Sequence, residues 1–268
     1  MKKVFALSLV LLVSQMAFAQ NGDVDGDGAV TSADVTCLYN YLLDGDETYL
    51  ATSDVDGDGF ITVGDITLVY NILLGNVHEY VDLGLPSGTL WAMTNVGASN
   101  PEDYGDYFAW GETTTKDVYN WSTYKWCNGS ENAITKYSNN IDNKTELDPE
   151  DDAATANWGP EWRMPSKEQI NELIVNCTDV WTKRNGVWGR LVTSKINGAS
   201  IFFPAAGYRW DSEFGNVGSF GSYWSRSRYV NSQQTACYLI ASYYNNLWCT
   251  ESVRSSGESV RAVRVSQK

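Results

Sequence analysis

The chain has 268 residues, and its 33 Asp and Glu outnumber its 19 Lys and Arg, which gives a net charge of −14. Such an acidic balance repels phosphate backbones and argues against a nucleic-acid partner. Hydrophobic residues make up 43% of the chain, enough for a folded core. The single His, His78, makes a Ser-His-Asp triad or a multi-His zinc site hard to build.

Residues 1–19 have the pattern of a signal peptide. Lys2 and Lys3 precede a short apolar stretch at residues 4–13, and residues 17–19 form an Ala-x-Ala cleavage signal. The apolar stretch is too short to span a bilayer as a stable helix. The sequence therefore predicts an exported protein without a membrane span. The expected destination is the extracellular space or the cell surface, with the periplasm as the alternative.

Charge and tryptophan are distributed unevenly along the rest of the chain. Residues 21–77 carry 11 acidic residues and no Lys or Arg, whereas all 11 Trp lie beyond His78. A change of composition this sharp indicates a domain boundary. We therefore predict two domains, residues 20–77 and residues 78–268, joined by a short linker near residues 75–77.

The acidic domain contains an internal repeat with an offset of 31 residues. The motif Asp-Val-Asp-Gly-Asp-Gly begins at Asp23 and again at Asp54, and an apolar stripe with helical spacing follows each copy. A 12-residue calcium loop takes oxygen ligands from positions 1, 3, 5, 7 and 12, and a Gly at position 6 allows its sharp turn. An acidic solvated loop is the competing interpretation, but it does not explain two copies in register. We therefore predict two Ca²⁺ ions. Their expected ligands are the carboxylates, and at position 7 the backbone carbonyls, of Asp23, Asp25, Asp27, Ala29 and Asp34 and of Asp54, Asp56, Asp58, Phe60 and Asp65.

These units differ from a full EF-hand, since only three residues of the domain precede the first loop and position 12 is Asp rather than Glu. Duplicated loop–helix units with Asp at position 12 resemble the dockerin family, here over about residues 21–76. The resemblance implies a small all-α calcium module that docks to a partner cohesin domain, mostly in polysaccharide-degrading bacteria. It also implies that loop positions 10 and 11 and the following helix face the partner. The corresponding residues are Ser32, Ala33, Tyr39, Asn40, Val63, Gly64, Tyr70 and Asn71.

Residues 78–268 have the pattern of a mixed α+β domain. Two hairpin turns are expected at residues 185–186 and 197–198, where Asn-Gly tolerates positive φ. Helices are expected to begin at Asp148, followed by Pro, and at Ser166, which opens a capping box. Strand-like runs occupy residues 80–85, 89–93, 106–110, 200–203, 222–224 and 259–265. The predicted fold class is therefore α+β, with a small all-α module followed by a mixed domain.

Six blocks of this second domain occur in the order typical of one family, among them VDLGLPSGTLWA, FFPAAGYR and SVRAVRV. They resemble the Fibrobacter succinogenes major paralogous domain over nearly all of residues 80–265. That resemblance implies a C-type-lectin-like fold and no established activity. The block WRMPS is also similar to one of the formylglycine-generating enzymes, which share that broad fold. Those enzymes need a closely spaced reactive Cys pair, which Cys237 and Cys249 do not provide.

Aromatic side chains are candidates for glycan binding, since sugars present C–H faces that pack on aromatic rings. They lie in segments rich in Asn, Ser and Gly, although packing in the core would explain them as well. The candidate ligand-binding residues are Trp181, Trp188, Tyr208, Trp210, Tyr223, Trp224 and Trp248, with Tyr243 and Tyr244 nearby.

Five Cys residues raise the question of disulfides, which export permits. Cys237 and Cys249 could face each other across a hairpin, and Cys127 could then pair with Cys177, although the sequence leaves the connectivity open. Cys37 replaces an apolar residue of the repeat and is expected to be a buried free thiol.

No residue pattern indicates catalysis. The acidic cluster at residues 148–152 is interpreted as a helix N-terminus rather than a cation site, and His78 as a solvated linker residue. The sequence thus favours a non-catalytic protein that docks to a cohesin-like partner in an assembly for polysaccharide degradation or glycan recognition. Two alternatives stay open: a tethered enzyme acting on polysaccharide, and a structural surface protein braced by its own calcium module.

Overall fold

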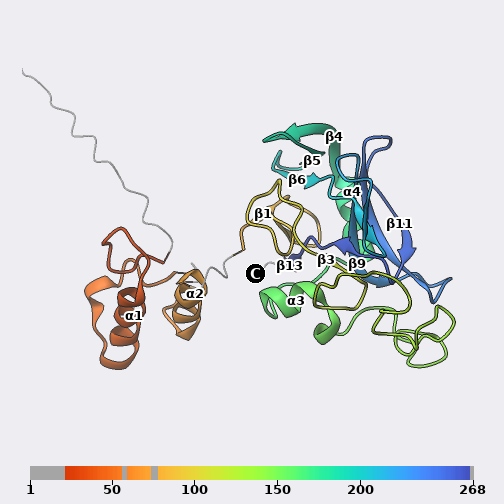
Figure 1. Cartoon of the computed structure of the whole chain (residues 1–268). Coiled ribbons are helices and arrows are strands. Elements are labelled where there is room, and N and C mark those ends of the chain that lie inside the picture. Colours follow the sequence, from red (N-terminus) through yellow and green to blue (C-terminus); the bar gives the residue numbers. More distant parts are fainter. Residues whose placement is uncertain (1–21, 56–58, 74–77, 266–268) are drawn as a thin grey trace, which may run out of the picture. The chain divides into compact units, whose positions relative to one another are not determined.

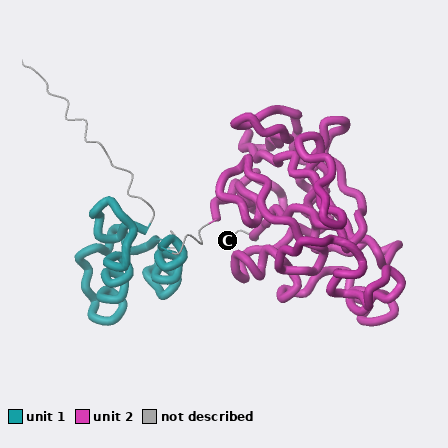
Figure 2. The backbone as a smooth tube through the Cα atoms, in the orientation of Figure 1, with its two compact units in different colours: residues 1–77 teal, residues 78–268 magenta. Residues whose placement is uncertain are grey.

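The computed structural model describes residues 22–55, 59–73 and 78–265. The chain forms two compact units, residues 1–77 and residues 78–268, shown in two colours in Figure 2. The split lies between the same two residues as the change of composition. Helix accounts for 19% and strand for 30%, which is compatible with the expected α+β class. The predicted signal peptide lies outside the described residues. Within the described ranges, no helix is long and apolar enough to cross a membrane.

The first unit is built from helices α1 (Ser32–Asp44) and α2 (Val63–Leu73), with a short 3-10 helix η1 (Glu47–Tyr49) between them (Figure 1). Each long helix begins directly after one of the acidic loops. A capping box at Thr31 starts α1, and Gly45, with φ of 69°, ends it in the left-handed conformation that glycine favours. The described part of the unit is therefore all helix and loop, as the repeat predicts.

Each repeat contributes three equivalent residues to the core of this unit. Val24, Val35 and Leu38 of the first repeat pack with Val55, Ile66 and Val69 of the second. Cys37 is a free thiol, partly buried against this cluster, as expected for a residue acting as a hydrophobe. Six buried side chains in the described part of the unit make a small core, so we expect the loops to contribute to its stability.

The second unit has a central five-stranded sheet in the order β11-β10-β9-β12-β3, in which the β12–β9 pair is parallel. Three smaller sheets have the orders β1-β2-β13, β4-β5-β6 and β7-β8. The helices are η2 (Pro149–Asp151), α3 (Ala153–Trp158) and α4 (Lys167–Asn176). The strands are β1 (Tyr80–Asp82), β2 (Thr89–Ala92), β3 (Tyr107–Phe108), β4 (Cys177–Arg184), β5 (Val187–Ser194), β6 (Ser200–Pro204), β7 (Tyr208–Trp210), β8 (Glu213–Gly215), β9 (Phe220–Arg228), β10 (Thr235–Ser242), β11 (Trp248–Val253), β12 (Glu258–Ser259) and β13 (Val263–Val265).

Several turns and helix starts of this unit follow from local sequence signals. Asn185 and Gly186 both have positive φ and join β4 to β5, and the second Asn-Gly turn joins β5 to β6. The Ser166 capping box opens α4 and is confirmed. The helix expected at Asp148 is only a 3-10 turn without a side-chain cap. Helix α3 starts instead at Asp152, whose carboxylate accepts hydrogen bonds from two N–H groups of the first turn.

Two fully buried arginines organise the loops of the second unit. Arg254 donates through Nε to the Tyr124 hydroxyl and through its terminal nitrogens to three backbone carbonyls, and its guanidinium lies over the Trp110 ring. Arg261 donates to Asn95 Oδ1 and to the carbonyls of residues 92 and 93. These contacts join segments far apart in sequence, which a pattern of local residues does not reveal.

The predicted disulfides are wrong, because all five cysteines are free thiols. Cys127 and Cys177 belong to different hydrophobic clusters, so packing keeps them apart. On the antiparallel strands β10 and β11, Cys237 is opposite Glu251, and Cys249 is opposite Leu239. The two cysteines are thus diagonal neighbours rather than a directly facing pair, and a disulfide needs closely approaching Cβ atoms.

Candidate calcium centre and aromatic surfaces

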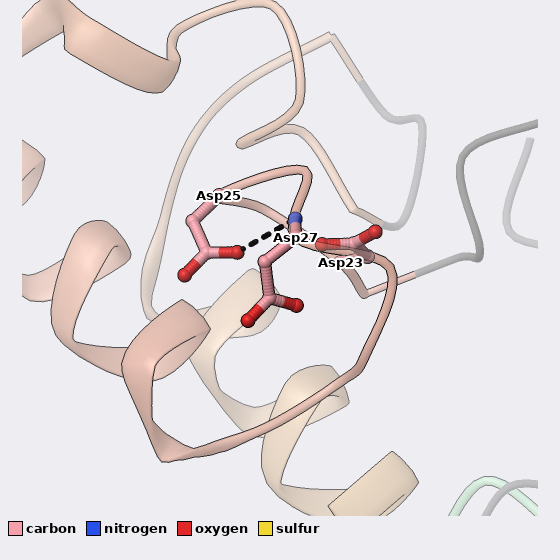
Figure 3. Close-up of side chains that lie close together, drawn as sticks. All are labelled: Asp23, Asp25 and Asp27. Atoms are coloured by element: carbon pink, nitrogen blue, oxygen red, sulfur yellow. Dashed lines mark hydrogen bonds between the residues drawn. The ribbon is translucent and has the colours of Figure 1, made fainter. Parts of the chain in front are cut away.

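The first acidic loop gathers three carboxylates around one point. Oxygen atoms of Asp23, Asp25 and Asp27 all lie within 4.8 Å of one another (Figure 3). Asp23 Oδ2 accepts a hydrogen bond of 3.0 Å from the N–H of Gly28, whose φ of 92° forms the turn at position 6. Asp23 Oδ1 is buried without a hydrogen-bond partner. A buried, unpaired carboxylate oxygen is costly unless a cation compensates it, so these residues fit a hard cation such as Ca²⁺.

Position 12 of the first loop has a different environment. The Asp34 carboxylate is fully buried and accepts hydrogen bonds from the N–H groups of Val24 (2.6 Å), Asp25 (3.1 Å) and Thr31 (2.7 Å). It therefore fastens the start of the loop to the first turn of α1. Its assignment as a calcium ligand, and that of the Ala29 carbonyl, stay predictions.

The second loop repeats the hydrogen bonds of the first. Asp54 Oδ2 accepts from the N–H of Gly59 at 3.0 Å, and the Asp65 carboxylate accepts from Val55 and Thr62, both at 2.7 Å. Asp65 is fully buried, like Asp34. The predicted ligands Asp56 and Asp58 lie outside the described residues, and the role of Phe60 stays a prediction. Matching bonds at matching positions show that the two loops share one framework.

The predicted docking residues lie on the surface of this unit. Ser32, Ala33 and Asn40 are exposed, and the exposed fraction of the Tyr39 side chain is 44%. In the second repeat, the exposed fractions are 68% for Val63 and 46% for Tyr70. Gly64 is exposed as well, whereas Asn71 is half-buried. Leu43, near the end of α1, is a further exposed apolar residue that the sequence did not single out.

This geometry defines a duplicated loop–helix module of the calcium-binding class. Residues 21–74 match the dockerin type I domain family, so this segment is a dockerin type I domain. Dockerin domains bind calcium and imply docking to cohesin domains, and the proteins that carry them are usually extracellular or on the cell surface. No curated protein and no solved structure matches the chain.

The aromatic candidates of the second unit fall into separate groups. Tyr223 and Trp224 are buried core residues of the central strand β9, which corrects their assignment as ligand-binding residues. A second group lies on β4, β5 and the loop after β10. There the rings of Trp181 and Trp188 are stacked at 5.9 Å and 14°, and Tyr243 meets Trp181 edge-on at 5.8 Å. Trp248 is half-buried on β11.

Tyr208 and Trp210 form a third group, which lines a cavity of about 190 Å³. Sequence reasoning did not identify the cavity's buried acid, Glu258, because no motif surrounds it. The remaining lining residues are Phe220, Tyr238, Ser252, Val253 and Ser256.

The acidic cluster before α3 is neutralised by lysines. Lys136 bridges Asp148 at 2.9 Å and Asp151 at 2.6 Å. Hydrogen bonds from Lys144 and Lys136 lower the pKa of Asp148 to about 2. These partners explain the cluster without a cation.

His78 is not the solvated residue expected from the sequence. Its ring is stacked on Trp158, with centroids 3.7 Å apart, and it meets Trp162 edge-on. Partial burial lowers its pKa from the ordinary value.

Proposed function

We propose that this chain is an exported, non-catalytic adaptor that docks to a cohesin-like partner through residues 20–77 and recognises a glycan through residues 78–268. The match of residues 21–74 to the dockerin type I domain is the observation that carries the proposal. The destination is the extracellular space or the cell surface, in an assembly that degrades polysaccharides or recognises glycans.

The dockerin domain holds two Ca²⁺ ions in this proposal. The converging carboxylates of Asp23, Asp25 and Asp27 support the first site. The repeated loop hydrogen bonds of Asp54 and Asp65 support the second. Asp34→Ala and Asp65→Ala each reduce the number of bound ions from two to one, which titration calorimetry measures. A stoichiometry of one in the wild type contradicts the second site.

The exposure of residues at loop positions 10 and 11 and on both helices supports a docking face there. Binding to cohesin domains is tested with the full mature chain by pull-down and interferometry, with and without a calcium chelator. We expect capture that the chelator abolishes. Capture of equal strength in excess chelator contradicts calcium-dependent docking.

The second unit is proposed to have a C-type-lectin-like fold with a glycan-binding surface at Trp181, Trp188 and Tyr243. Two stacked indoles with an edge-on phenol offer the apolar ring faces on which sugars pack. The exposed fractions of Trp188, 41%, and Tyr243, 61%, leave these side chains accessible. A glycan array identifies the ligand, and Trp188→Ala abolishes that signal while Leu43→Ala, in the other unit, preserves it. An array without any signal contradicts glycan recognition by this unit.

The non-catalytic assignment is supported by the chemistry of the cavity. Glycoside hydrolysis requires two carboxyl groups about 5–9.5 Å apart across the scissile bond. Glu258 is the only carboxyl residue that lines the cavity in the described part of the chain. Release of reducing sugar from plant or host polysaccharides by the mature chain overturns this assignment in favour of the tethered enzyme.

A further inference from the structure

The cavity of the second unit is lined by aromatic side chains and by one buried carboxyl group, that of Glu258. Tyr208, Phe220 and Tyr238 are half-buried, and the exposed fraction of Trp210 is 41%, so the aromatic side chains reach the surface. Glu258 is buried on β12, a strand within the central sheet. A cavity of about 190 Å³ is smaller than a typical drug-sized site and holds a single small group.

Hydroxyl groups surround the Glu258 carboxyl on three sides. Oε1 accepts hydrogen bonds from Ser252 at 3.0 Å and from Ser256 at 2.8 Å, and Oε2 lies against the Ser222 hydroxyl. In the described part of the chain, no ion pair compensates this carboxyl. A buried carboxylate without a cation pays the full cost of desolvation.

The serine hydroxyls show how a neutral Glu258 carboxyl would avoid that cost. Ser222 Oγ is also 2.9 Å from the Gly207 carbonyl, which accepts its proton. Because a hydroxyl has one proton, Ser222 donates either to the Gly207 carbonyl or to Glu258 Oε2; when it donates to Gly207, a protonated Oε2 can donate to Ser222 in return. Ser256 has the same choice, between the Val253 carbonyl and Glu258, both at 2.8 Å. Burial accordingly raises the pKa of Glu258 to about 7, so that its carboxyl is largely neutral below that pH.

We propose that this cavity binds an alkylated ammonium group, with the aromatic rings around its methyl groups and Glu258 as its counter-ion. Aromatic rings attract cations through their electron-rich faces, most strongly where water is excluded. When the carboxylate is ionised, Ser252, Ser256 and Ser222 donate to it and occupy most of its acceptor positions, so a primary ammonium with three N–H donors finds too few partners. A quaternary ammonium has no N–H group and therefore needs no hydrogen-bond acceptor. Acidic residues also outnumber basic residues within residues 78–268, which favours the approach of a cation.

The proposal implies that binding releases a proton. A bound cation favours the ionised carboxylate and therefore lowers the pKa of Glu258. Affinity should then be constant above pH 7 and fall about tenfold for each pH unit below it. The nearby Tyr107 and Tyr238 stay neutral, because burial raises the pKa of both phenols. The charged groups nearby are Arg209, which lies over the Phe214 ring, and Glu251, which is exposed on β11.

The test uses the mature chain with choline and its neutral isostere 3,3-dimethylbutan-1-ol as probes, measured by calorimetry between pH 5.5 and 8.5. We expect choline to bind about tenfold or more tightly than the alcohol, as cation–π contacts and one carboxylate imply. Proton release should appear as a dependence of the heat on the buffer's ionisation enthalpy. Ethanolamine, the primary ammonium analogue, should bind more weakly than choline.

Three variants sharpen the experiment. Glu258→Gln keeps the shape and donates to Ser222 as the neutral acid does, so it should remove both the preference for choline and its pH dependence. Trp210→Ala should weaken choline binding. Trp188→Ala removes an indole with the same exposed fraction of 41% outside the cavity and should leave choline binding intact.

Equal affinities for choline and the alcohol, or no choline binding at millimolar concentration, overturn the proposal. If Glu258→Gln does not fold, the wild-type pH dependence decides instead. Choline affinity that is independent of pH across 7 then rejects Glu258 as the counter-ion. Because the cavity and the Trp188 surface are separate, failure here leaves the proposed docking and glycan recognition untouched.

Discussion

The two units of this protein are stabilised in opposite ways. Among its described residues, the dockerin domain has six buried apolar side chains in its core, and the carboxylates of Asp34 and Asp65 hold its two loops in place. The second unit has several hydrophobic clusters and two fully buried arginines that bond to distant carbonyls. We therefore expect the short repeat to depend on bound calcium, whereas the longer, non-repetitive unit has buried cations among its own side chains.

Removal of calcium should produce the largest difference between the units. Without the ion, the loop carboxylates repel one another, and the small core does not fold alone. Because all 11 Trp lie in the second unit, tryptophan fluorescence reports that unit separately from far-UV helix signal. Excess chelator should decrease the helix signal and leave the fluorescence unchanged. A helix signal that survives chelation, or that magnesium alone restores, contradicts calcium-dependent folding.

Loss of a buried arginine should destabilise the second unit rather than the dockerin domain. Arg254→Met removes the donor to the Tyr124 hydroxyl and to three backbone carbonyls, which leaves those acceptors buried and unpaired. We expect the free energy of unfolding of the second unit to fall by more than about 4 kcal/mol. Denaturation followed by tryptophan fluorescence measures it. The control Lys183→Met removes an exposed cation over Trp188 and should change it by less than about 0.5 kcal/mol. A similar loss of unfolding free energy in both variants would contradict a stabilising role for the hydrogen bonds of Arg254.

The two repeats of the dockerin domain differ most at the exposed loop positions. Ser32 and Ala33 of one repeat correspond to Val63 and Gly64 of the other, so a partner that contacts both faces equally must accept a hydroxyl and an isopropyl group at the same place. We therefore expect one preferred orientation. Ala33→Asp and Gly64→Asp should weaken cohesin binding unequally, with a loss of about tenfold, or roughly 1.4 kcal/mol, for only one of them. Interferometry measures both.

Equal small losses in the single variants, with binding lost only in the double variant, would show two interchangeable orientations. Unchanged binding in the double variant would place docking elsewhere and favour the calcium module as an internal brace.

The smallest expected effect is the pH dependence of stability that His78 causes. Burial against Trp158 lowers its pKa, so the folded protein binds fewer protons than the unfolded chain near pH 6.5. The stacking contribution is therefore complete above the unfolded pKa and decreases as the pH falls below it. Because the chain has a single His, its NMR titration is unambiguous. A midpoint at or above 6.5, or the same pH dependence of stability in His78→Gln, contradicts the stacked arrangement.

The dockerin domain could be predicted in detail because its information is local. Each predicted ligand and the glycine at position 6 lie within a loop of 12 residues, and the copy that begins at Asp54 supports the interpretation of the copy that begins at Asp23. In the second unit, the same kind of signal identified the Asn185-Gly186 turn and the Ser166 cap. The local signal failed at Asp148, because Asp152 caps the helix instead. The Asp152 carboxylate is buried and also accepts hydrogen bonds from the N–H of Met164.

The sequence by itself therefore determined the domain boundary, the two acidic loops, the helices that follow them and the tight turns, because these depend on neighbours along the chain. Only the tertiary structure decided which aromatic residues are core, since Trp224 and Trp188 lie in similar sequence surroundings but differ completely in burial. It also decided the free state of the cysteines and the cavity around Glu258. That cavity joins residues of β7, β9, β10, β11 and β12, and long-range packing alone brings such side chains together.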